Sequence, residues 1–223
     1  FRNMLLQFSV SNFRSFRDLQ TLDLGASNYD KTLPENCIDP QFPGLKDRRW
    51  VKGVAIYGAN ASGKSTVLEA MQALSEMVGN SAKRTSPEEL ISEVQPFALD
   101  PDCLVKPTGF GVVFVANGIR YEYRVAATRE RIYHESLRAY PKGKEQLWFE
   151  RRWDQEKKEH YFGPENPTGL PRAKDIERRT LPNVLYLSKS IADNRGALWD
   201  VFNWLSSFLT FIDFSTGQSL GTQ

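Results

Sequence analysis

The chain has 223 residues, of which 40% are hydrophobic and 12% aromatic, enough for one large folded domain and too many for a disordered chain. Its 29 basic and 27 acidic residues give a net charge of +2, which neither demands nor excludes a nucleic-acid partner. Cys37 and Cys103 lack CxxC spacing, which excludes a disulfide framework and a cysteine zinc site. With no signal peptide and no apolar run near the roughly 20 residues of a membrane span, we expect a cytoplasmic protein without membrane contact.

The N-terminal quarter predicts a hairpin, an irregular loop and a buried strand. Alternating apolar and polar residues predict strands over 5–13 and 19–25, joined as a hairpin within region 4–25, with Met4 taken as the natural start. Residues 26–50, with three prolines and mixed charge, predict an irregular loop. The apolar run at 53–57 then predicts a short strand that is buried on both faces.

The middle of the chain predicts a helix followed by a β-rich block. Helical spacing of apolar residues predicts a helix over 65–78, which completes region 53–78. Four prolines break residues 79–108. Region 108–163 predicts a β meander, in which Asn117-Gly118 marks a hairpin turn.

The C-terminal part predicts a return to mixed structure. Residues 163–182, rich in proline, glycine and charge, predict a surface loop. Region 183–223 begins with an apolar run at 183–188 that predicts a buried strand, and 196–209 predicts an amphipathic helix. The whole of 4–223 is therefore expected to be of the α/β class, with an antiparallel β-rich subdomain.

Between the strand at 53–57 and the helix at 65–78 lies the sequence GANASGKST, which satisfies G-x-x-x-x-G-K-[ST]. Gly58 and Gly63 permit the backbone to bring successive N–H groups to a phosphate, and the helix N-terminus adds partial positive charge. In this motif Lys64 reaches the β- and γ-phosphates and the Ser65 hydroxyl ligates Mg²⁺. The alternative is a turn of small residues capped by Ser62.

The order of residues inside this loop narrows the class of P-loop protein. With Asn60, Ala61 and Ser62 ahead of Gly63-Lys64-Ser65-Thr66, it resembles the loop of the ABC, SMC and RecF-like ATPases. Those ATPases also open with a strand that carries NF[RK]-[SN]-[FY], and VSNFRSF matches it here. The resemblance implies that Arg14 approaches the nucleotide phosphates. From its place in the first hairpin we predict that Arg14 contacts these phosphates or a neighbouring acid near the loop; the alternative is a turn charge in water.

Several patterns in order extend the resemblance over nearly the whole chain: FSVSNFRSF, IYGANASGKSTVLEAM, VQPFALDP, FGVVFVANGIRYEYRV with ESL, and LPNVLYLS. Together they resemble the N-terminal half of the AAA/ABC-type ATP-binding proteins of bacterial anti-phage and abortive-infection loci, relatives of the overcoming-lysogenisation-defect ATPases. The resemblance implies an ABC-type P-loop head that binds ATP and Mg²⁺. It also implies that two heads form a dimer and that a nuclease or toxin effector is coupled to them.

The resemblance also implies motifs that this chain does not clearly contain. The Walker B Asp-Glu pair, the signature loop and the switch histidine are expected in a second half. Asp213 follows apolar residues but precedes Phe214 instead of a glutamate, and the STGQ and LGTQ stretches lack the helix of a signature loop. Gln95 comes early for a Q-loop glutamine. We therefore expect a lobe that binds Mg-ATP and hydrolyses it poorly by itself.

Other functions are less well supported by the sequence. A RecF-like role in DNA repair remains open. A GTPase should show the sequence N/T-K-x-D, which this chain lacks. A small-molecule kinase usually has an arginine-rich lid framed by glycines, and PRAKDIERR is a poor match to it because it has too many acids and no glycine. His134 and His160 are interpreted as ordinary strand residues. The basic pairs, such as Arg151-Arg152, are interpreted as solvated faces, with nucleic-acid contact beside Trp148 and Trp153 as the alternative.

Overall fold

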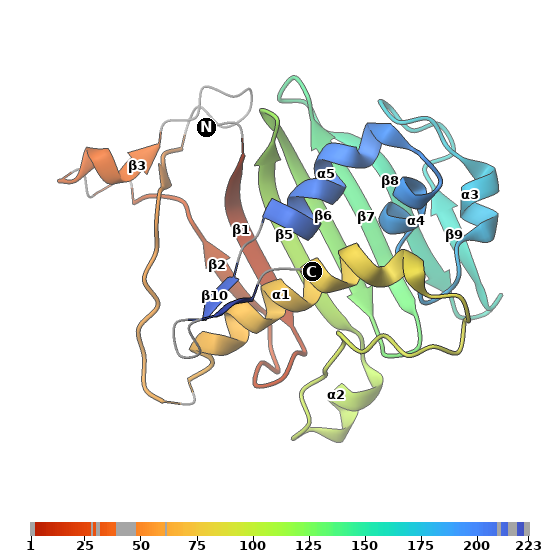
Figure 1. Ribbon diagram of the computed structural model, residues 1–223, viewed down its shortest axis with the longest axis horizontal. Helices are drawn as coiled ribbons and strands as arrows, with labels where there is room; N and C mark the ends of the chain where they lie inside the picture. The colour runs from red at the N-terminus through yellow and green to blue at the C-terminus, as the bar shows by residue number, and fades with distance from the viewer. Residues whose placement is uncertain are drawn as a thin grey trace.

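A computed structural model describes residues 3–27, 29, 32–38, 48–60, 62–208, 211–213 and 218–220, with the backbone alone for 208, 211–213 and 218–220. Its centre is an antiparallel sheet of seven strands in the order β2-β1-β5-β6-β7-β8-β9 (Figure 1). The strands are β1 Met4–Ser11, β2 Gln20–Asp23, β5 Thr108–Ala116, β6 Ile119–Ala127, β7 Ile132–Tyr140, β8 Gln146–Asp154 and β9 Glu159–Gly163.

Both predicted hairpins are present, and they belong to one sheet. Asn117 and Gly118 have φ of 48° and 80°, the positive values that a tight two-residue turn between β5 and β6 requires. The sequence did not indicate that β1 pairs with β5, with Val10 opposite Phe110 across about a hundred residues of chain. This pairing joins the N-terminal hairpin to the meander.

Helices cover one face of this sheet (Figure 1). The long helix is α1 Lys64–Asn80, followed later by α4 Tyr186–Ala192, the 3₁₀ turn η3 Gly196–Leu198, α5 Trp199–Asn203 and the π-helical turn η4 Trp204–Phe208. The predicted helix over 196–209 is thus a succession of three helix types. Trp204 is 2% exposed and stacks on Phe114 of β5 with ring centroids 4.1 Å apart, so it packs in the core. Trp199, by contrast, is exposed.

Shorter elements occupy the segments that the sequence left irregular. They are η1 Pro34–Asn36, β3 Cys37–Ile38, β4 Trp50–Val51, η2 Ser81–Lys83, α2 Pro101–Val105, α3 Lys174–Arg179, β10 Phe211–Asp213 and β11 Gln218–Leu220. Among the described residues, no helix is both long and apolar enough to cross a membrane.

Two predicted strands are wrong. Residues 53–57 form no strand, and Val54, Ile56 and Tyr57 are exposed, because the described residues supply no neighbouring strand for them. Residues 183–188 are buried as expected, but they enter helix α4 at Tyr186. A short apolar run is equally compatible with a buried strand and a buried helix, so hydrophobic periodicity alone could not distinguish the two.

A buried polar network fastens the start of α4 to the sheet. The fully buried Glu135 carboxylate accepts hydrogen bonds from the Tyr123 hydroxyl (2.9 Å) and from the N–H groups of Tyr186 (2.6 Å) and Leu187 (2.9 Å). Burial raises the pKa of Glu135 and pushes the pKa of Tyr123 well above its ordinary value. The carboxylate therefore serves as the N-terminal partner of this helix.

Arg151 extends the network on the neighbouring strand. Its guanidinium donates to the carbonyls of Val184 (2.6 Å) and Leu181 (2.9 Å) and to His160 Nδ1 (3.2 Å). Arg151 is 0% exposed, which corrects its interpretation as a solvated charge, and burial lowers its pKa to about 10. Since the sequence shows only one more arginine in a strand, its burial could not be predicted.

Candidate nucleotide-binding loop

The predicted phosphate loop leads directly into the first turn of α1. Gly63 is the N-cap residue of this helix and has φ of +89°, a conformation that glycine adopts without the steric cost paid by other residues. The helix begins at Lys64, as the motif predicts. The loop and helix are therefore arranged in the order that a phosphate cradle needs, although the segment before the loop has no regular secondary structure.

Lys64 folds back over the loop. Its Nζ lies 2.8 Å from the Gly58 carbonyl oxygen and 2.7 Å from that of Ala59, and it donates to both. Gly58 also closely approaches Ser62, because a Cβ built on Gly58 would lie 2.7 Å from Ser62 Oγ. The ammonium group is thus held against the loop, within reach of a polyphosphate bound there.

The start of α1 presents donors that have no partner in the described part of the chain. No side chain caps the helix, and no acidic residue lies in its first turn. The N–H groups of Lys64, Ser65 and Thr66 make no hydrogen bond to any other described residue. Such N–H groups and the exposed hydroxyl of Ser65 fit a phosphate group with its magnesium ion.

Three consecutive residues of the β1–β2 turn contact α1 along one side. Arg14 Nη1 lies 2.7 Å from Glu69 Oε2, and Ser15 Oγ lies 2.9 Å from Thr66 Oγ1. The Phe16 ring lies against Gly63, since a Cβ built there would be 2.5 Å from Phe16 Cε1. The N-terminal hairpin therefore touches the helix at positions 63, 66 and 69.

Arg14 has the neighbouring acid that the sequence offered as one of its partners. Its backbone N–H donates to the Gln95 carbonyl (2.8 Å) and its Nε donates to Gln95 Oε1 (2.8 Å), in addition to the Glu69 ion pair. These contacts hold its guanidinium beside Glu69, six residues after Gly63. Arg14 as a ligand of phosphate remains a prediction.

A cavity of about 250 Å³ lies beside the contact between the hairpin and the loop. Phe8 and Leu22 line it from the sheet, Tyr57 from the segment before the loop, and Gly63 and Lys64 from the phosphate loop. Asn60 is exposed beside it, whereas Ala61 lies outside the described residues. The loop thus borders a hollow that is partly apolar and partly polar.

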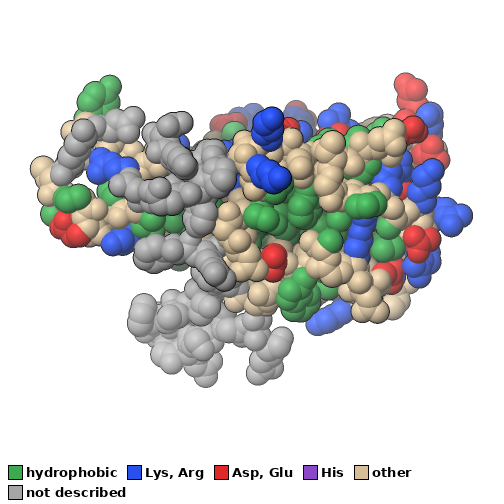
Figure 2. Space-filling model, turned by 90° about the horizontal axis from the view of Figure 1, so that it is seen from above, with side chains coloured by type: hydrophobic (Ala, Val, Ile, Leu, Met, Phe, Trp, Pro, Cys, Tyr) green, Lys and Arg blue, Asp and Glu red, His purple; other side chains and the backbone are tan. Residues whose placement is uncertain are grey.

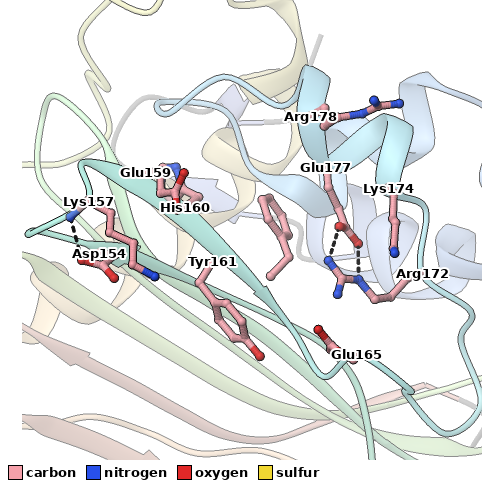
Figure 3. A pocket seen from close by; sticks show the side chains of 11 residues that line it. Asp154, Lys157, Glu159, His160, Tyr161, Glu165, Arg172, Lys174, Glu177 and Arg178 are labelled. Atoms are coloured by element: carbon pink, nitrogen blue, oxygen red, sulfur yellow. Dashed lines mark hydrogen bonds and ion pairs between the residues drawn. The ribbon is translucent and has the colours of Figure 1, made fainter.

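A larger hollow, about 710 Å³, lies elsewhere, between β9 and α3 (Figure 3). There Arg172 donates two hydrogen bonds to Glu177, at 2.9 and 2.5 Å, and Glu165 and Lys174 lie nearby. Since β9 and β2 are opposite edges of the sheet, this segment is far from the phosphate loop. The PRAKDIERR stretch is therefore no lid over the loop.

The remaining basic pairs are distributed as the sequence predicts. Figure 2 shows basic and acidic side chains interspersed at the end of the molecule that carries β9 and α3. Arg152 pairs with Glu150 at 2.8 Å, and Arg179 pairs with Asp175 at 3.2 Å. His134 lies in β7 as expected and contacts Glu150.

Sequence reasoning missed the residues that support the loop. Ser15 and Phe16 contact the start of α1, while Asn12 and Gln95 anchor the turn to other segments. Only the SNFRSF pattern signalled that this turn mattered. Asp213 lies in β10, which pairs antiparallel with β11, and its side chain lies outside the described residues. The STGQ and LGTQ stretches also lie largely outside them.

Comparison with known protein families gives one match. The sequence model of the family described as "AAA domain, putative AbiEii toxin, Type IV TA system" matches residues 54–204, more than half of the chain. The matched region contains the phosphate loop, α1 and the strands β5 to β9. A search of curated proteins found no match.

Proposed function

The chain belongs to this AAA-domain family, and from that premise we propose that it is the ATP-binding lobe of an ABC-type ATPase that acts in bacterial abortive infection. As an AAA domain it is a P-loop protein of the ATPase class. The family description places such domains with a toxin of a toxin–antitoxin system. We propose that ATP binding here controls a nuclease or toxin effector, and that nucleic acid is a further candidate partner.

The observation that carries the proposal is the geometry of residues 58–66. Gly63 in its left-handed conformation, the N–H groups at the start of α1 that have no partner among the described residues, and the Lys64 ammonium lie together. These groups would hold the β- and γ-phosphates of ATP, and Ser65 would ligate the magnesium ion. The bound Mg-ATP supplies the phosphoanhydride bond, while these residues bind and orient it.

The exposed segment before the loop supports a site that is shared with another part of the protein. Val54, Ile56 and Tyr57 are 52%, 39% and 89% exposed, an unusual state for an apolar run beside a nucleotide site. We propose that parallel strands outside the described residues cover this run and bring the carboxylate that orients the attacking water. Two such heads would then close on ATP as a dimer.

Phosphate release with Mg-ATP tests the shared site. This chain should bind ATP in preference to GTP, yet turn it over several orders of magnitude more slowly than the full-length protein, on the scale of about 10³–10⁵ for single groups in phosphoryl transfer. Full-length protein should also form more dimer with ATP than without it. Equal turnover by the chain and the full-length protein would show that the chain already holds every group that hydrolysis needs.

A further inference from the structure

We propose that the β1–β2 turn sets the conformation of the phosphate loop, and that Phe16 is the positioning residue through which it does so. The inference rests on the proposed function, because it concerns how the same loop becomes competent to bind nucleotide. It assigns a role to a residue that would itself touch neither phosphate nor magnesium.

The contacts between the turn and the helix follow a helical spacing. Phe16 meets Gly63, Ser15 meets Thr66 and Arg14 meets Glu69. Residues three apart lie close to one another on the surface of a helix, so the three contacts run along one face of the first two turns. The turn therefore fixes both where α1 begins and how it is rotated about its axis.

The contact at Phe16 acts on the most constrained residue of the loop. Gly63 has φ of +89°, and the space into which a Cβ would project is filled by the Phe16 ring at 2.5 and 3.0 Å. Phe16 is itself fixed, because its N–H and carbonyl both pair with Phe13 at 2.8 Å. The ring therefore closes one side of the space in which Gly63 can move.

The turn is anchored independently of the loop. Asn12 is 5% exposed, and its amide nitrogen donates to the carbonyls of Cys103 (2.8 Å) and Lys106 (2.9 Å). Its amide oxygen accepts from the N–H of Phe97 at 3.0 Å. Gly58, Ala59 and Asn60, by contrast, are exposed. The anchored turn thus lies against an exposed loop, so the turn can fix the conformation of the loop.

The expected consequence is a change in nucleotide affinity without the loss of a nucleotide contact. When the ring is removed, Gly63 gains conformations in which the N–H groups at the start of α1 no longer converge on one phosphate. Only the molecules whose loop has the binding conformation can then bind nucleotide, so the apparent affinity falls in proportion to their fraction.

Calorimetric titration of Mg-ATP into the Phe16→Ala variant tests this role. We expect about tenfold weaker binding, on the scale found for residues that orient the ligands of other bound groups. Leu19→Ala is the matched control, since Leu19 is an apolar residue of the same β1–β2 connection that is 66% exposed, and it should bind as the wild type does. Phe16→Leu keeps apolar bulk at the contact, so it should recover most of the affinity; it also carries the test if Phe16→Ala does not fold.

A second readout separates positioning from general stability. Gly63→Ala should weaken Mg-ATP binding in both backgrounds, but its fold-change in affinity should be about five times smaller in Phe16→Ala than in the wild type. The reason is that the added methyl group no longer meets the ring. Wild-type affinity in Phe16→Ala, or purely additive effects of the two changes, would overturn the proposal. If Lys64→Ala still weakened binding in that case, the positioning role alone would fail. If Lys64→Ala had no effect, the proposed function would fail instead.

Discussion

The buried carboxylate of Glu135 provides the sharpest test of how the helical layer is held to the sheet. Glu135→Gln preserves the shape of the side chain but replaces one acceptor oxygen with an NH₂ group. The N–H groups of Tyr186 and Leu187 donate to different carboxylate oxygens, at 2.6 and 2.9 Å. In the variant, one of these two N–H groups must therefore face the NH₂ group, which is itself a donor. A buried donor without a partner costs about 1–3 kcal/mol, and the loss of the charge beside the buried Arg151 adds to it.

We expect Glu135→Gln to lower the free energy of unfolding by about 3 kcal/mol. Tyr123→Phe removes one of the three hydrogen bonds and leaves the carboxylate with its two N–H partners, so it should cost about 1 kcal/mol. Glu150→Gln, on the opposite face of the sheet, is the control for a partly exposed carboxylate and should cost no more than about 1 kcal/mol.

Urea denaturation followed by circular dichroism measures these differences. With a denaturant dependence of about 2 kcal/mol per molar urea, a loss of 3 kcal/mol moves the midpoint by about 1.5 M. A midpoint shift for Glu135→Gln no larger than that for Tyr123→Phe would refute the reasoning. The carboxylate would then not be the group that anchors α4.

Two further predictions concern charged groups. Burial and the nearby Arg151 lower the pKa of His160 to about 4 from its ordinary 6.5, so the unfolded chain takes up a proton before the folded one as the pH falls. The free energy of unfolding should therefore drop by about 2 kcal/mol between pH 6.5 and 4, after allowance for partial exposure. In urea titrations at different pH values, His160→Gln should remove that part of the pH dependence. Arg14→Ala should change the thermal midpoint little, because the side chains of Arg14 and Glu69 are 40% and 39% exposed. If the guanidinium moves to the phosphates when nucleotide binds, Arg14→Ala should weaken Mg-ATP binding. Unchanged affinity in calorimetry would leave Arg14 with a surface ion pair as its only role.

The parts of this molecule that the sequence predicted are those whose chemistry permits few alternatives. Only certain residues form a tight two-residue hairpin turn, so Asn117-Gly118 located β5 and β6. Residues 58–66 located the start of α1, because a phosphate cradle needs glycines, a lysine and a hydroxyl at fixed spacing. In both cases a local pattern determines a local structure.

The parts that the sequence could not predict depend on distant partners. A strand at 53–57 needs neighbours to pair with, and none of the described residues supplies one. The pairing of β1 with β5 and the burial of Arg151 beneath α4 depend equally on contacts across the chain. Phe16 contacts Gly63 across 46 intervening residues, so its position at the phosphate loop could be seen only in the folded protein.

The most direct measurement of the central claim compares Mg-ATP binding to the wild type, Lys64→Ala and Lys83→Ala. Each variant removes one lysine from an end of the same helical stretch, but Lys64 contacts the loop carbonyls whereas Lys83 contacts Asn80. Lys64→Ala should weaken binding by about 2 kcal/mol, which is about 30-fold, and Lys83→Ala should leave it unchanged. Equal affinity of the wild type and Lys64→Ala would contradict the assignment of residues 58–66 as the nucleotide-binding loop.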